Sequence, residues 1–180
     1  ILESLIHAGA ENEVKVVVNS IHSEYLDKEN ISKNLRQLDG IIVAPGFGQR
    51  GLDGKILAVE YARVNKIPFL GICLGMQMAV IEYARNVKKI RYANSTEISE
   101  KCKDPVIDLM TSQQEIINKG GTMRLGACDC EIEKNTKSYK CYKKKLISER
   151  HRHRYEFNNN YTDRIFDDKF VIAGSNPDTK

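Results

Sequence analysis

Compact apolar runs alternate with amphipathic stretches in the first half of the chain. The runs at residues 41–44 (IIVA) and 67–72 (IPFLGI) are almost entirely apolar, as is typical of parallel strands buried on both faces. Amphipathic stretches over residues 54–65 and 74–85 follow them and predict helices. The order strand, helix, strand, helix predicts an α/β fold, in which helices flank a mostly parallel central sheet and the crossovers are right-handed.

The remaining segments predict further elements. Residues 2–10 predict the end of a helix with Gly9 as its C-cap, and the β-branched run at residues 14–21 (VKVVVNSI) predicts a strand. A short helix is expected at residues 32–38, strands are expected at residues 105–110, 120–132 and 169–175, and a polar surface loop is expected at residues 111–119. Because no linker divides the chain, residues 1–180 are expected to form one domain.

A cysteine between two glycines stands where the second apolar run ends. Residues 71–75 read Gly-Ile-Cys-Leu-Gly, which is the thiol counterpart of a serine nucleophile elbow. The glycines permit a tight strand-to-helix turn, and the N-terminus of the following helix favours the thiolate of Cys73. The N–H of Leu74 would then point to where an oxyanion forms. A buried, inert cysteine in a tight packing corner explains the same five residues equally well.

The loop at residues 45–48 (PGFG) follows the first apolar run. Because the carboxyl ends of neighbouring parallel strands meet at one edge of a sheet, this loop and Cys73 are expected to lie close together. Gly46 could then present its backbone N–H to an oxyanion with no Cβ in the way. Glycine-rich turns of this kind are common. The position of this one, a single strand–helix unit before the elbow, is what supports a role in an oxyanion hole.

Composition narrows the class of protein. Hydrophobic residues make up 41% of the chain and charged residues 29%, which indicates a soluble globular domain, and no apolar run approaches membrane-spanning length. The five cysteines are odd in number and irregularly spaced, so reduced thiols in a cytoplasmic protein are expected. The net charge of +4 permits an anionic partner without requiring one.

The densest charge cluster lies at residues 149–158 (ERHRHRYEFN). Strand alternation would divide its side chains between two faces, with Arg150, Arg152 and Arg154 on one and His151, His153 and Tyr155 on the other. The cluster is compatible with a solvated basic strand, a carboxylate or phosphate clamp, or a nucleic-acid patch. The mild net charge and the lack of aromatic stacking platforms argue against nucleic acid.

Several stretches of the chain match a known family, in the family's order. They read APGFGQRGLDGKI, IPFLGICLGMQMAVIEYARNV, ANSTE, PVIDLM, GGTMRLGA and SERHRHRYEFNN. On these stretches the chain resembles the glutaminase domain of the CTP synthase family, a class I glutamine amidotransferase with a flavodoxin-like fold. The elbow is shared by all class I amidotransferases, whereas the motifs GGTMRLG and RHRHRYE are much more specific and favour CTP synthase.

The resemblance implies the chemistry of the elbow. Cys73 would attack the side-chain amide of glutamine, and the N–H groups of Gly46 and Leu74 would form the oxyanion hole. The loop departs from the family pattern, because Pro45 stands where the family commonly has a glycine. Proline fixes φ, so we expect this loop to flip less freely.

The resemblance also implies how glutamine would be held. Glu97 would bind the α-ammonium group of the substrate, and Arg154 would hold its carboxylate end, as opposite charges require. The glutamine pocket would further be lined by Leu74, Gly75, Met76 and Gln77.

The catalytic His and Glu of the family are the largest departure. They lie in a Phe-His-Pro-Glu motif that does not occur in the 180 residues, and none of the four histidines matches the triad base by family pattern. We therefore expect the domain to be truncated at both ends, with the amidoligase domain preceding Ile1 and the His/Glu segment following Lys180. Because triad members act as a unit, glutamine turnover by the chain alone should be weak or absent.

The resemblance implies further partners. No cofactor is expected in this domain, whereas ATP and Mg²⁺ would bind the missing amidoligase domain and GTP would act as activator. Expected partners are L-glutamine, the amidoligase domain of the same polypeptide and the other subunits of a homotetramer, with no nucleic acid and no membrane. Two alternatives stay open: another class I amidotransferase of the GMP synthetase type, and a non-catalytic ligand-binding domain in which Cys73 is inert.

Overall fold

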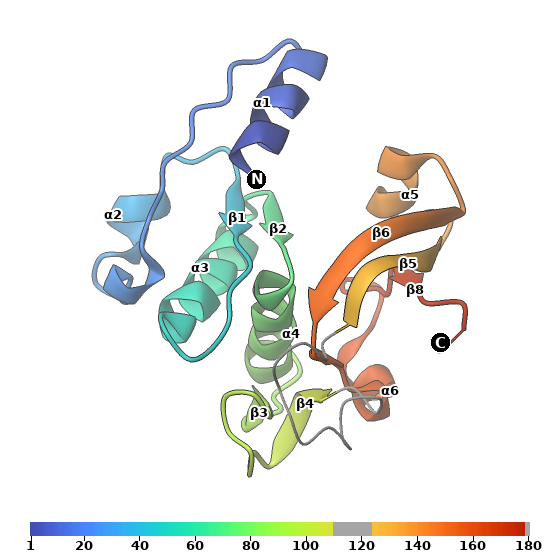
Figure 1. Cartoon of the computed structure of the whole chain (residues 1–180). Helices are drawn as coiled ribbons and strands as arrows, with labels where there is room; N and C mark the ends of the chain where they lie inside the picture. Colours follow the sequence, from blue (N-terminus) through green and yellow to red (C-terminus); the bar gives the residue numbers. More distant parts are fainter. Residues whose placement is uncertain (110–123, 179–180) are drawn as a thin grey trace.

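The computed structural model describes residues 1–109 and 124–178, and Figure 1 shows their arrangement. The first half contains α1 (Leu2–Glu11), the 3-10 helix η1 (Ser23–Tyr25), α2 (Ile31–Leu35), β1 (Ile41–Val43), α3 (Leu52–Asn65), β2 (Phe69–Gly71) and α4 (Leu74–Asn86). The second half contains β3 (Ala93–Ser95), β4 (Asp104–Leu109), β5 (Arg124–Ile132), α5 (Lys137–Tyr142), β6 (Leu146–His153), β7 (Tyr155–Phe157), the 3-10 helix η3 (Asn159–Tyr161), α6 (Thr162–Ile165) and β8 (Gly174–Ser175).

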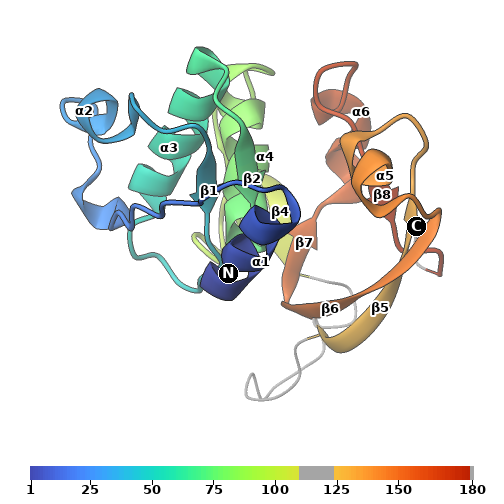
Figure 2. The same ribbon diagram turned by 90° about the horizontal axis from the view of Figure 1, so that it is seen from above.

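The described strands form three small sheets, two of which pack against helix α4. Strands β1 and β2 pair in parallel and are connected through α3, while β3 pairs in parallel with β4. Strand β7 joins β4 in antiparallel orientation, and β5 pairs antiparallel with both β6 and β8. Figure 2 shows β1, β2 and α3 on one side of α4, and the long β5–β6 hairpin on the other. This arrangement confirms the predicted α/β fold with parallel strands and flanking helices.

Helix α4 forms the centre of the core. Met78, Ile81 and Ala84 are completely buried, and they pack among the buried side chains of α3, β1 and β4. The helix is buried on nearly all sides because α3, β1 and β2 cover one flank and β3, β4 and β7 the other. In the part of the chain that the structure describes, no helix is both long and apolar enough to cross a membrane.

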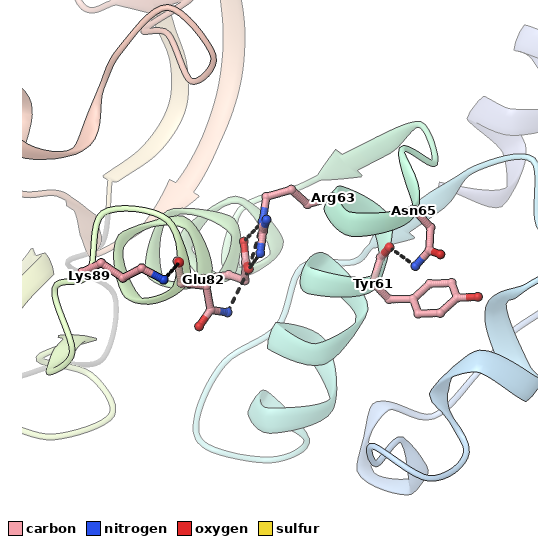
Figure 3. A network of polar contacts seen from close by, with 6 residues as sticks. Tyr61, Arg63, Asn65, Glu82 and Lys89 are labelled. Atoms are coloured by element: carbon pink, nitrogen blue, oxygen red, sulfur yellow. Dashed lines mark hydrogen bonds and ion pairs between the residues drawn. The ribbon is translucent and has the colours of Figure 1, made fainter.

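An ion pair between a buried carboxylate, Glu82, and a partly exposed guanidinium, Arg63, connects α3 to α4 (Figure 3). Glu82 has a side chain only 1% exposed, and its carboxylate accepts hydrogen bonds from Nε and Nη2 of Arg63 (2.6–3.1 Å) and from the side-chain amide of Asn86 (2.9 Å). These hydrogen bonds raise the pKa of the Arg63 guanidinium above its ordinary value. A buried carboxylate needs such partners, since an unpaired one would carry its full desolvation cost.

The predicted strand at residues 14–21 is wrong. This segment has no regular secondary structure, and its apolar side chains are exposed, with Val17 73% accessible. Its β-branched composition favours extended backbone, but a strand also needs a neighbour to complete its ladder of hydrogen bonds, and none of the described strands pairs with it.

The prediction that the parallel strands are buried on both faces also needs correction. Ile42 and Leu70 are partners in the β1–β2 register, yet they are 37% and 54% exposed. They lie on the face opposite to Ile41 and Val43, which are buried, so the pair of strands is covered on one face rather than on both.

Gly9 is not the C-cap of the first helix. Helix α1 continues to Glu11 and is capped at Asn12. Gly9 is buried within the helix, where a Cβ would lie 2.8 Å from the carbonyl oxygen of Val14. The glycine therefore permits the close approach of the chain that returns past the helix.

The remaining expected elements are present with shifted bounds. Helices and strands were found near residues 32–38, 54–65, 74–85 and 105–110, whereas the run at 169–175 contributes only the two residues of β8. The surface loop predicted at residues 111–119, together with Met110 and residues 120–123 of the expected strands, lies outside the described residues.

Candidate active site

The turn between β2 and α4 has the geometry of a nucleophile elbow. Cys73 lies at the turn with φ 55° and ψ −109°, a conformation that non-glycine residues rarely adopt and that structures retain mainly at functional sites. A Cβ at Gly71 would lie 2.6 Å from the backbone of Gly75, and a Cβ at Gly75 would overlap the carbonyl oxygen of Val43. The two glycines therefore let α4 pack directly onto the strand ends, with Cys73 at the helix N-terminus.

A cavity of about 270 Å³ opens beside Cys73. Residues from the loop after β1, the elbow, the turn after β3 and the junction of β6 with β7 surround it. The lining residues are Gly46, Phe47, Cys73, Gln77, Glu97, His153, Arg154 and Tyr155. The structure thus brings together five of the predicted site residues, Gly46, Cys73, Gln77, Glu97 and Arg154.

The other three predicted residues do not line the cavity. Leu74 is buried with its side chain in the core, Gly75 packs against β1, and Met76 is 41% exposed. Leu74 nevertheless lies next to the loop after β1, because a Cβ at Gly46 would be 3.2 Å from Leu74 Cδ2. The roles predicted for the backbone of Leu74, Gly75 and Met76 stay predictions.

Gln77 carries a buried hydrogen-bond acceptor. It is 4% exposed, and its Nε2 donates to the carbonyl oxygen of Tyr155 at 3.0 Å. Within the described residues its Oε1 atom is buried without a hydrogen-bond partner. Such atoms are rare in folded proteins and need an explanation, and an N–H group of a ligand in the cavity would provide one.

The opposite wall comes from a change of sheet at Arg154. Strand β6 pairs with β5 up to His153, and β7 pairs with β4 from Tyr155 onward, so Arg154 is the one residue between two strands of different sheets. In a regular strand consecutive side chains point to opposite faces. The break explains how three consecutive residues, 153–155, all reach the cavity. Arg150 and Arg152 stay exposed, so the predicted common face of three arginines does not extend to Arg154.

Both ring nitrogens of His153 lie near other groups. Its Nε2 is 3.0 Å from Nδ1 of His151, and its Nδ1 is 3.3 Å from the carbonyl oxygen of Tyr155. The thiol of Cys73 donates to the carbonyl oxygen of Arg152 at 3.8 Å. These contacts orient His153 within the cavity wall and direct the thiol of Cys73 to the backbone of Arg152.

The pKa values of two other cysteines, Cys102 and Cys130, are shifted away from that of a reactive thiol. Burial raises the pKa of the Cys102 thiol, with a smaller contribution from the charge of Asp108, and burial also raises the pKa of Cys130. A raised pKa lowers the thiolate fraction near neutral pH. In residues 1–109 and 124–178, no group of three His, Cys, Asp or Glu side chains is placed to hold a metal ion.

Phe47, His153 and Tyr155 were not predicted as site residues. Phe47 stands in the glycine-rich loop, and alternation had placed His153 and Tyr155 on a face of their own. Alternation thus grouped His153 with Tyr155, but the sequence alone does not show that the chain segment carrying them lies beside Cys73. Burial and the nearby charge of Glu97 raise the pKa of Tyr155.

Comparison with known proteins agrees with this geometry. The family model "Glutamine amidotransferase class-I" matches residues 1–180, and the chain belongs to this family. Its curated relatives include "CTP synthase" of Flavobacterium johnsoniae, with 58% identity over 179 residues, and "CTP synthase" of Clostridium acetobutylicum, with 52% over 180 residues. These matches cover 99% and 100% of the chain but 33% and 34% of the relatives, so the chain spans about a third of their length.

A solved structure identifies the matching part. "Trypanosoma brucei CTPS - glutaminase domain with bound acivicin" is 39% identical with a TM-score of 0.87, and the match covers 96% of this chain and 67% of that one. Within the family, the chain therefore corresponds to the glutaminase domain of CTP synthases. The resemblance stated from the sequence is confirmed.

Proposed function

We propose that the chain releases ammonia from glutamine for the conversion of UTP to CTP, which a further domain of the same polypeptide carries out with ATP and Mg²⁺. The observation that supports this most is the cavity at the elbow, which Cys73 lines together with an acidic residue, Glu97, and a basic residue, Arg154. An amino acid carries an α-ammonium and an α-carboxylate. The two protein charges complement these groups, while the thiol can reach the side chain.

The proposed reaction proceeds through a thioester. The sulfur of Cys73 bonds to the carboxamide carbon of glutamine, and the N–H groups of Gly46 and Leu74 stabilise the oxyanion. The carbon–nitrogen bond then breaks, and the nitrogen leaves as ammonia after it takes up a proton. Water cleaves the thioester to give glutamate and the free thiol. The proton transfers need a base, which we assign to the His/Glu motif of the family, outside these 180 residues.

Substrate orientation would come from the two charged residues and Gln77. The carboxylate of Glu97 would bind the α-ammonium group, and Arg154 the α-carboxylate, through charge-assisted hydrogen bonds. The unpartnered Oε1 of Gln77 would accept an N–H of the substrate. Holding both ends of the amino acid fixes the carboxamide relative to Cys73, which lowers the entropic part of the barrier.

The larger assembly is part of the same proposal. The relatives are about three times as long as this chain, which supports an additional amidoligase domain with the ATP and Mg²⁺ sites. We further propose GTP as activator, a homotetramer as the assembly and the cytoplasm as the location.

The test replaces Cys73 by alanine in the full-length protein. CTP formation with glutamine should fall at least about 10⁴-fold, as expected when a nucleophile is removed, whereas CTP formation with free ammonia should keep the parent rate. Formation of GMP instead of CTP would favour the GMP synthetase type. Full glutamine-dependent activity in Cys73→Ala would favour the non-catalytic alternative for this domain.

A further inference from the structure

Two hydrogen bonds connect the loop after β1 to the turn that follows β3. The backbone N–H of Gly48 donates to Oε1 of Glu97 at 3.1 Å, and Nε2 of Gln49 donates to the carbonyl oxygen of Ile98 at 2.9 Å. Both bonds join segments 49 residues apart in sequence. The same loop carries Gly46, to which the proposed function assigns an oxyanion-hole N–H.

Glu97 thus both contacts the loop and lines the cavity. One of its carboxylate oxygens accepts the hydrogen bond from Gly48, and the residue also lines the cavity that Arg154 lines. A carboxylate has about four acceptor positions on two oxygens. It can therefore keep the bond to Gly48 and still accept from an ammonium group of the substrate.

Building on the proposed function, we propose that Glu97 is also a positioning residue for the oxyanion loop, so that one carboxylate couples recognition of the substrate's α-ammonium group to the placement of the Gly46 N–H. A bound ammonium group would fix the Glu97 side chain. The fixed side chain would in turn fix Gly48, two residues from the oxyanion donor. Glutamine would then order the loop that stabilises its own transition state.

Packing holds the loop at Gly46, where a Cβ would lie 3.2 Å from Leu74 Cδ2, but not at the two residues that follow. Phe47 is 59% exposed and is approached by the guanidinium of Arg152, whose Cζ lies 5.9 Å from the ring centroid. Gly48 itself has φ +74° with no atom within 4 Å of a Cβ position. The loop is therefore not held by packing at this point, and its hydrogen bonds to the turn after β3 matter for its placement.

Three variants of the full-length protein separate the two roles of Glu97. Glu97→Gln keeps an oxygen that can accept from Gly48 but loses the negative charge, while Glu97→Ala loses both. Gln49→Ala removes the second bond to the turn and touches no residue of the cavity. Arg50→Ala is the matched control, because Arg50 bonds Glu24 at 2.6 Å and not the turn after β3.

The decisive readout is the division between KM and kcat for glutamine hydrolysis. Gln49→Ala should lower kcat about tenfold with KM nearly unchanged, since an oxyanion hole acts in the transition state. The loss should be smaller than the about 10²–10³-fold caused by deleting an oxyanion donor. Arg50→Ala should stay within about twofold of the parent. An unchanged kcat in Gln49→Ala would overturn the proposal.

A substrate without the α-amino group gives the second readout. With 4-carbamoylbutanoate, Glu97→Gln should retain the parent rate within about threefold, whereas Glu97→Ala should lose about tenfold more. Equal rates for these two variants would also overturn the proposal. The thermal unfolding midpoint should be similar in all variants, which checks that each has folded. Failure of the parent to hydrolyse glutamine would instead contradict the proposed function.

Discussion

The two walls of the cavity are built in different ways. The wall that carries Cys73 consists of short parallel strands and two helices, with a buried core and glycines that let backbone contact backbone. The wall that carries Arg154 is the junction of two strands from different sheets, and its side chains are exposed or half-buried. The elbow that carries the Cys73 thiol is thus held by close packing, while the charge proposed to recognise substrate lies where a strand changes partners.

This difference predicts that changes in the first wall cost stability and changes in the second cost substrate use. Glu82 and Arg63 provide the largest expected effect. Arg63→Met leaves the Glu82 carboxylate buried with Asn86 as its remaining partner, and should lower the free energy of unfolding by about 3–4 kcal/mol, towards the lower end of the range for a broken buried pair because the Arg63 side chain is itself 34% exposed. Denaturant unfolding of the variant domain measures this loss.

A double variant serves as the control for that experiment. Arg63→Met combined with Glu82→Met removes both charges, and replacing a buried ion pair by apolar side chains is often nearly neutral. Most of the stability should therefore return. A loss below about 1 kcal/mol for Arg63→Met alone would show that the ion pair between Arg63 and Glu82 (Figure 3) contributes little to stability.

The glycine of the elbow should give the next largest effect. In Gly75→Ala the new methyl group meets the carbonyl oxygen of Val43, and because this atom belongs to a buried strand the cost should reach about 3 kcal/mol, the upper part of the range for overpacking. Gly40→Ala is the matched control. Its Cβ would lie 3.6 Å from the nearest atom, an ordinary contact, so thermal unfolding should be unchanged or shifted slightly upward.

A change at Arg154, in the second wall, should affect the use of glutamine and leave the stability of the fold unchanged, and its free-energy effect should be smaller. Arg154→Ala should lower kcat/KM for glutamine about tenfold to hundredfold, because a charge-assisted hydrogen bond of this kind is worth about 1.5–3 kcal/mol. Steady-state CTP formation with free ammonia should stay near the parent rate.

Arg150→Ala is the control on the same strand, since Arg150 is exposed and does not line the cavity. Its glutamine defect should be smaller. Equal loss of the glutamine and ammonia activities in Arg154→Ala would assign this residue to folding or to a domain interface.

The sequence predicts the first wall better than the second for a physical reason. The elbow is encoded within five residues, Gly71 to Gly75, because two nearby glycines remove the side chains that would block the packing of α4 on the strand ends. The apolar runs on either side have the expected periods, so the strands and helices could be placed within a few residues. What the runs could not show is that one face of β1 and β2 is exposed at Ile42 and Leu70.

The second wall and the segment at residues 14–21 depend on contacts between distant segments. Alternation alone predicts that Arg154 shares a face with Arg150 and Arg152, and it cannot reveal that the strand changes sheets at this residue. Similarly, a β-branched run predicts extended backbone, but pairing is decided by neighbours that a single sequence does not specify.

The central claim is that Cys73 is the nucleophile of a glutamine site, and covalent labelling tests it most directly. The full-length protein would be treated near neutral pH with an electrophilic glutamine analogue, and the adducts would be located by peptide mass mapping. The account predicts one adduct within this domain, on Cys73, formed more slowly when glutamine is present in excess. Faster labelling of Cys128 or Cys141, or labelling of Cys73 that glutamine does not slow, would contradict it.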